Sequence, residues 1–159
     1  MPDSSGKNAL IIKKTEDFLK KNADRCNLEM AFLFGSRTTP FSRRDSDIDI
    51  GVVFSSSIET DSASTLSDDA VFANIMDISL DLLKLLNLEV NIVPVYPDFR
   101  KPMLYYNIIV LGKPLFIKNF EKYIALRNEA VYQMEDFSIF GERWKRDIAQ
   151  KRLDELLNA

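Results

Sequence analysis

Four residues that could bind a charged ligand lie within fifteen positions of one another. Gly35 and Ser36 follow a short apolar run, and Asp47 and Asp49 come after ten intervening residues. A glycine lets the backbone approach a ligand closely. A serine hydroxyl and the N–H groups that open a helix can hold a phosphate. Arg37 adds a cation beside them, so Gly35, Ser36 and Arg37 are candidate phosphate-binding residues.

The two aspartates predict a metal site. They stand at the start of an apolar strand, IDIGVVF, where side-chain alternation places both on the same face. Neighbouring carboxylates repel each other, and a divalent cation removes that repulsion. Mg²⁺ takes one or two protein carboxylates together with phosphate oxygens and water. Either feature alone is more typical of a helix cap or a solvated strand end, but the two together favour a metal–phosphate site.

Composition excludes several kinds of chemistry. The 159-residue chain has no histidine, so it cannot form a Ser-His-Asp triad, a Cys-His pair or a histidine-based zinc site. The single cysteine, Cys26, cannot make an internal disulfide, and we expect a buried thiol and a cytoplasmic location. A net charge of −3 gives no sign of nucleic-acid binding. No apolar run approaches the roughly 20 residues that span a membrane.

Hydrophobic periodicity predicts alternating helices and strands. Helices are expected at residues 8–25, 70–87, 100–111, 120–134 and 143–157, and strands at 28–34, 48–54, 88–95 and 115–117. Residues 55–69 read as a Ser/Thr/Asp-rich loop. This order indicates one α/β (α+β) domain over residues 1–159, with helices packed on one face of a sheet. A core at 8–117 is followed by a helical C-terminal tail at 119–159.

The spacing from Gly35-Ser36 to Asp47-Ile48-Asp49 resembles the signature of the minimal nucleotidyltransferases in the DNA polymerase β superfamily. The resemblance covers residues 28–117. It implies the nucleotidyltransferase fold with a mixed sheet. It also implies a triphosphate on Gly35 and Ser36, and two Mg²⁺ ions with Asp47 and Asp49 as ligands.

The resemblance further predicts a third carboxylate on the next core strand, where this chain has Asn91. An amide oxygen can ligate a metal but cannot take a proton from an attacking hydroxyl. Glu89 is the candidate substitute; it lies on the same strand face, about 6.5 Å further along, and a register shift or bulge would bring it closer. Asp47, Asp49, Glu89 and Asn91 are therefore the candidate catalytic residues.

Family membership would imply Mg²⁺-dependent transfer of a nucleoside monophosphate, with AMP from ATP as the expected case, to a hydroxyl on a protein. Short members of this family often serve as antitoxins of small helical HEPN-domain toxins, which makes a HEPN-type protein the expected partner. The tail resembles those of such antitoxins from Tyr132 to Phe137 and in the basic amphipathic helix that follows. Phe137, Phe140 and Trp144 are candidates for either the core or a protein interface.

Two alternatives stay open. The chain could be an antitoxin that acts by binding its toxin directly, with catalysis lost through Asn91. It could instead modify a small molecule such as an aminoglycoside, although enzymes of that type usually carry an extra helical domain for the acceptor. The sequence does not identify the base, the acceptor or the oligomeric state.

Overall fold

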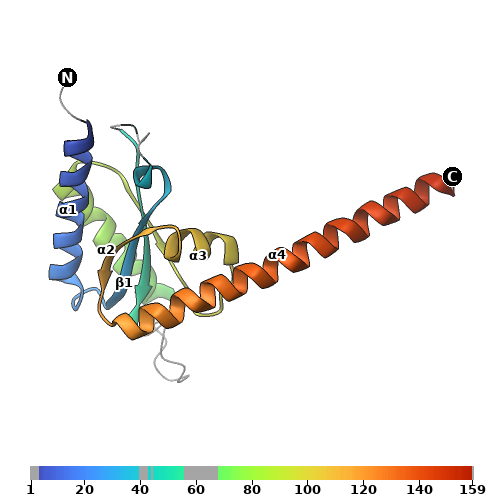
Figure 1. Cartoon of the computed structure of the whole chain (residues 1–159). Coiled ribbons are helices and arrows are strands. Elements are labelled where there is room, and N and C mark those ends of the chain that lie inside the picture. The colour runs from blue at the N-terminus through green and yellow to red at the C-terminus, as the bar shows by residue number, and fades with distance from the viewer. Residues whose placement is uncertain (1–3, 40–42, 44, 56–67, 159) are drawn as a thin grey trace.

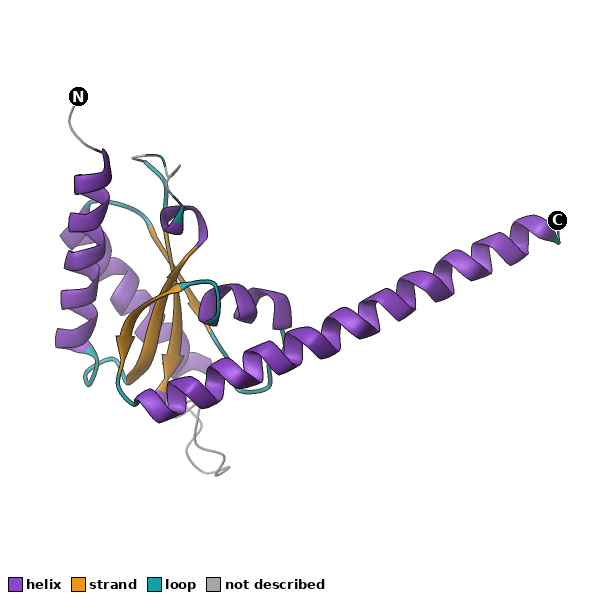
Figure 2. Cartoon of the chain, in the orientation of Figure 1, coloured by secondary structure: helices purple, strands orange, loops and turns teal. Residues whose placement is uncertain are grey.

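The computed structural model describes residues 4–39, 43, 45–55 and 68–158, which form four helices, one 3₁₀ helix and four strands (Figures 1 and 2). The helices are α1 (Ser4–Asn22), η1 (Gly35–Thr38, the 3₁₀ helix), α2 (Asp68–Leu86), α3 (Pro102–Ile109) and α4 (Phe120–Leu157). The strands are β1 (Leu28–Phe34), β2 (Ile48–Phe54), β3 (Val90–Pro94) and β4 (Lys113–Ile117). They form one sheet in the order β3-β2-β1-β4. Because β2 and β3 are parallel and the other pairs antiparallel, the predicted mixed sheet is confirmed.

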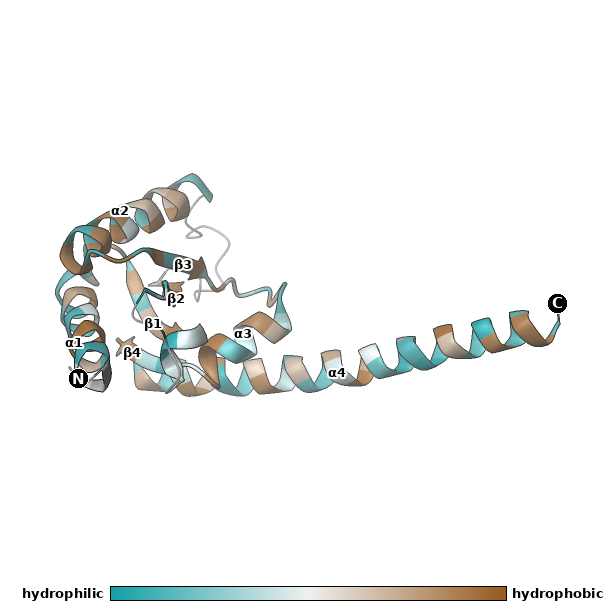
Figure 3. Ribbon diagram, turned by 90° about the horizontal axis from the view of Figure 1, so that it is seen from above, coloured by the Kyte–Doolittle hydropathy of each residue, from teal (hydrophilic) through white to brown (hydrophobic). Residues whose placement is uncertain are grey.

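Helices cover both faces of the sheet, so the prediction that they pack on one face is wrong. Ile48, Ile50 and Val52 of β2 pack toward α1 and α2. On the other face, Val53 joins a second core with α3 and the first part of α4. Figure 3 shows α2 and α3 on opposite sides of the sheet. The physical reason is that β1 and β2 are apolar at successive positions, and a strand that is apolar on both faces must be covered on both.

The two central strands have the predicted bounds, whereas other elements differ at their ends. Helix α1 spans Ser4–Asn22 instead of 8–25, β3 is shorter than the predicted 88–95, and α3 is shorter than 100–111. Of the predicted loop at 55–69, residues 56–67 lie outside the described part of the chain. Cys26 is buried as predicted, and burial raises the pKa of its thiol.

Helix α4 is one continuous helix of 38 residues, where the sequence predicted two. The residues between the predicted helices include no proline, and Gly141 weakens a helix by only about 1 kcal/mol relative to alanine. Up to Ala130 the helix packs on the body, where the rings of Tyr123 and Phe32 lie 5.8 Å apart. Beyond it, residues 131–157 project away from the body (Figure 1), and we call this segment the arm. No helix among the described residues is long and apolar enough to cross a membrane.

Candidate functional site

The turn after β1 is built from backbone and threonine hydrogen bonds. Gly35 has φ +78°, a left-handed conformation that favours glycine, and η1 follows at once. The hydroxyl of Thr38 donates to Gly35 O at 2.7 Å, and that of Thr39 donates to Ser36 O at 2.8 Å. The Ser36 side chain caps no helix, and no described residue bonds to its hydroxyl. These hydrogen bonds fix the turn, while the side chain of Ser36 is exposed to solvent.

Gly35 lies directly against the carboxylate of Asp49. Phe34 pairs with Asp49 in the β1–β2 register, and a Cβ placed on Gly35 would overlap Asp49 Oδ2. Glycine is thus required here twice, for its φ and for this close approach. The structure brings the predicted phosphate-binding turn and one predicted metal ligand into contact.

Asn91 lies beside Asp49 on the neighbouring strand. The two residues are partners in the parallel β2–β3 register, and Asn91 Nδ2 donates to Asp49 Oδ1 at 3.1 Å. The amide thus occupies the lateral position expected for a third carboxylate. Because the oxygen and nitrogen of an amide can exchange places by a flip, Asn91 can also present its oxygen to a cation.

Glu89 lies two residues before Asn91 in the sequence, outside the Asp49–Asn91 pair. The β2–β3 register is regular from Ile48 and Val90 onward, and Ile48 N donates to Glu89 O at 3.0 Å. With no bulge in this pairing, Glu89 stays next to Asp47 and does not reach the place of Asn91. Both Glu89 and Asp47 are exposed.

Arg37 is turned into the protein. Its side chain is 4% exposed, and its guanidinium donates to Ser46 O at 2.6 and 3.2 Å and to Asn8 Oδ1 at 3.1 Å. In this orientation it holds the residue before Asp47 and ties that segment to α1, so the geometry favours a positioning role over phosphate contact. The sequence carried no signal for Asn8, because it meets Arg37 across 29 positions.

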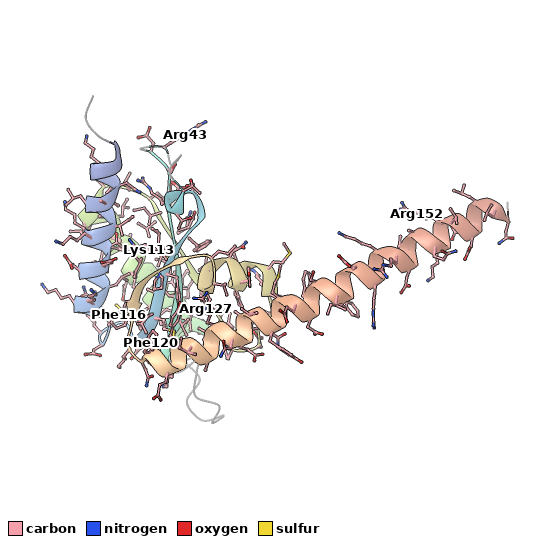
Figure 4. All side chains as sticks on the ribbon, viewed as in Figure 1. Arg43, Lys113, Phe116, Phe120, Arg127 and Arg152 are labelled. Atoms are coloured by element: carbon pink, nitrogen blue, oxygen red, sulfur yellow. The ribbon has the colours of Figure 1, made fainter. Side chains whose placement is uncertain are left out.

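Arg43 is a cation of the same loop that does face solvent. Its side chain is exposed and lies near η1 (Figure 4), and its backbone N–H donates to Ser46 Oγ at 3.2 Å. On sequence alone, Arg43 is indistinguishable from ordinary surface charge. It lies in the segment that leads through Asp47 into β2.

The donor atoms suit Mg²⁺ bound together with a phosphate. The ion pairs among the described residues do not involve Asp47 or Asp49, so neither acid is neutralised by a lysine or arginine there. Within the same residues no three His, Cys, Asp or Glu side chains cluster as a metal cage. Magnesium does not need such a cage, because substrate phosphates and water complete its octahedron. Asp49 beside Gly35, the Asn91 amide beside Asp49 and the exposed carboxylate of Asp47 at the start of the same strand supply oxygen donors of the kind that Mg²⁺ prefers.

The chain belongs to the polymerase β nucleotidyltransferase family, since the family model "Polymerase beta, Nucleotidyltransferase" matches residues 13–121. This confirms the family suggested by the spacing of Gly35-Ser36 and Asp47-Ile48-Asp49. No curated protein matches the sequence.

Three solved structures that share the fold are toxin–antitoxin complexes. A toxin–antitoxin with AMP-PNP is 20% identical over 84% of this chain and 98% of that chain, with a TM-score of 0.60. The tri-AMPylated Shewanella oneidensis HEPN toxin in complex with MNT antitoxin gives 18% identity, 87% and 98% coverage, and a TM-score of 0.58. An MntA–HpeT variant with two aspartates changed to glutamate is 18% identical over 84% of this chain and 98% of that chain, with a TM-score of 0.59. These likenesses establish the fold.

Proposed function

We propose that the chain is a Mg²⁺-dependent nucleotidyltransferase that moves AMP from ATP to a hydroxyl of a small helical protein of the HEPN type. The observation that carries this proposal is the contact between Gly35 and the Asp49 carboxylate. It sets a phosphate-binding turn against a metal-binding acid, the arrangement that a metal–triphosphate complex needs. The structural neighbours support the substrate and partner, because one contains AMP-PNP and another an AMPylated HEPN toxin.

Each residue has a distinct role in the proposed site. The Ser36 hydroxyl and the N–H groups of η1 hold phosphate oxygens, and Asp47 and Asp49 hold the metal, with the Asn91 oxygen as a further donor. Bound Mg²⁺ supplies positive charge that offsets the carboxylates and the leaving pyrophosphate. Arg37 keeps Asp47 in place through Ser46.

The reaction is a displacement at the α-phosphorus of ATP. The acceptor hydroxyl oxygen forms a bond to that phosphorus while the bond to the bridging oxygen breaks, and pyrophosphate leaves. The hydroxyl proton must go to a base, and the Asn91 amide cannot accept it. We assign that proton to Glu89, which is exposed beside Asp47 at the open end of the site.

A second candidate function is favoured by the hydrogen bond between Asn91 and Asp49. An amide in place of a carboxylate lowers the negative charge that attracts Mg²⁺, so the chain could neutralise a toxin by binding alone. This function predicts that the complex forms without ATP and that neutralisation persists in Asp49→Asn.

Label transfer separates the two functions. The chain is incubated with Mg²⁺, α-labelled ATP and its helical partner; wild type should label the partner, and Asp49→Asn should not. Asp24→Asn is the matched control, because Asp24 is an exposed acid paired only loosely with Lys118, at 3.7 Å. Equal labelling by Asp49→Asn contradicts the assigned site. No labelling by wild type, with neutralisation intact in Asp49→Asn, favours action by binding alone.

A further inference from the structure

The face of α4 that packs on the body continues along the arm without cover. Ala130 is fully buried in the core, and Met134, Phe137, Gly141 and Ile148 follow at spacings of four, three, four and seven residues. That spacing keeps them on one side of a helix. Beyond Ala130 no described residue of α4 is buried, and Phe137 is 45% exposed. Figure 3 shows brown apolar positions recurring along this projecting helix.

Charge along residues 128–152 of α4 is divided into an acidic and a basic stretch, and two further acids, Asp154 and Glu155, follow near the end of the helix. Residues 128–142 contain acids and no lysine or arginine; the acids are Glu129, Glu135, Asp136 and Glu142. Residues 143–152 contain five bases and one acid; the bases are Arg143, Lys145, Arg146, Lys151 and Arg152, and the acid is Asp147. The boundary falls beside Gly141, which is also midway between Met134 and Ile148. The apolar stripe and the charge pattern therefore share one centre.

No close contact within the chain requires a glycine at position 141. A Cβ at this position would meet nothing within 4 Å, and its φ does not lie in the left-handed region. Glycine inside a helix is destabilising relative to alanine, so an uncovered helix gains nothing from it. A glycine at the centre of an apolar stripe allows the backbone of another helix to approach closely.

We propose that the arms of two copies of this chain cross in antiparallel orientation at Gly141. A two-fold axis at Gly141 sets Met134 of one copy opposite Ile148 of the other, in the self-complementary manner of an isologous dimer. It also lays each acidic stretch alongside the basic stretch of the partner. A parallel pair would bring like charges together, so the charge pattern selects the antiparallel one. The dimer is independent of the proposed nucleotide site.

The mass of the full chain in solution tests the dimer. Sedimentation of the chain alone should give twice the 18.3 kDa of one copy at high concentration. Phe137→Glu should raise the dimer dissociation constant at least about tenfold, as loss of an apolar interface anchor does. Ile139→Glu is the matched control: this residue is also exposed, 59%, but two positions along the helix and so on the opposite side of the arm. A monomer at every concentration, or equal effects of both variants, overturns the proposal.

Disulfide trapping tests the orientation. Two residues can be bridged only when their Cα atoms come within about 7 Å. At a two-fold axis Gly141 meets its own copy, so Gly141→Cys should crosslink on oxidation. Phe137→Cys alone should not crosslink. A mixture of Phe137→Cys and Lys145→Cys chains should crosslink, because positions 137 and 145 lie four residues on either side of Gly141 and face each other in an antiparallel pair. Cys26 is buried and gives little background. Self-crosslinking by Phe137→Cys as fast as by Gly141→Cys would indicate parallel arms and overturn the proposal.

Discussion

At the scale of single residues, the site depends on three side-by-side positions contributed by a turn and two strands. Gly35 leaves room for the Asp49 carboxylate, and Asn91 donates to that carboxylate from the next strand. The hydrogen bond gives the Asp49 carboxylate a neutral partner within the protein. In the proposed metal site, an amide at position 91 leaves one carboxylate fewer to attract the cation.

Asn91→Asp should make folding stability depend on Mg²⁺. Without the metal, the variant loses the amide donor and places a second carboxylate beside Asp49, so the free energy of unfolding should fall by about 1 kcal/mol or more. With Mg²⁺ the added carboxylate is neutralised and stability should return. Thermal unfolding in EDTA and in Mg²⁺ measures both. If the metal affects the variant no more than wild type, the assignment of this position to the metal site is wrong.

Arg37→Ala should destabilise the fold as well as the site. The variant removes a buried guanidinium and leaves Ser46 O and Asn8 Oδ1 without their donor, so we expect a loss of about 2 kcal/mol or more. Denaturant unfolding measures the change. Arg25→Ala is the control, because Arg25 is exposed and pairs with exposed Asp81; it should change stability little. Full stability in Arg37→Ala, with nucleotide binding lost, would instead assign Arg37 to phosphate contact.

At the scale of elements, α3 packs closely against β2, the strand that carries Asp49. Gly51 follows Asp49 on the same strand face, and a Cβ there would overlap the buried side chain of Ile108. This close approach lets α3 lie directly on the sheet, two residues along β2 from Asp49. Glycine within a strand is a recognised sign of such an approach, but the sequence did not indicate which helix would use it.

Gly51→Ala should therefore couple to Ile108. Overpacking at this contact should cost about 1–3 kcal/mol of unfolding free energy. In an Ile108→Ala background the space is open, so the same substitution should cost less, with a coupling of at least about 1 kcal/mol. A double-mutant cycle by denaturant unfolding gives that coupling. Additive costs would show that α3 does not rest on Gly51.

The sequence was most informative where local pattern decides structure. The bounds of β1 and β2 were predictable because each is an apolar run flanked by Gly35 or Asp47, and the family signature fixed which residues meet at their ends. The contact of Arg37 with Asn8 was not predictable, because both are common polar residues far apart in the chain. The order of helices and strands alone does not reveal packing on both faces; that follows from β1 and β2 being apolar at successive positions, which requires cover on both sides.

At the scale of the whole molecule, the chain combines a body that holds the site with an arm that carries no core. Residues 131–157 extend about 40 Å at the rise of an α-helix. A helix of that length with an exposed apolar stripe gains most of its stability from packing. Because the arm and the proposed nucleotide site lie on different parts of the molecule, the arm would bind a second copy of the chain without covering the nucleotide site.

The central claim is that Asp49, which lies against Gly35, holds a metal–triphosphate complex together with Asp47. Calorimetric titration of the chain with AMP-PNP in Mg²⁺, and again in EDTA, tests it most directly. We predict binding that requires Mg²⁺ and weakens at least about tenfold in Asp47→Asn/Asp49→Asn, whereas Asp24→Asn binds like wild type. Equal affinity of the double variant and wild type, or binding that EDTA leaves unchanged, would contradict the account.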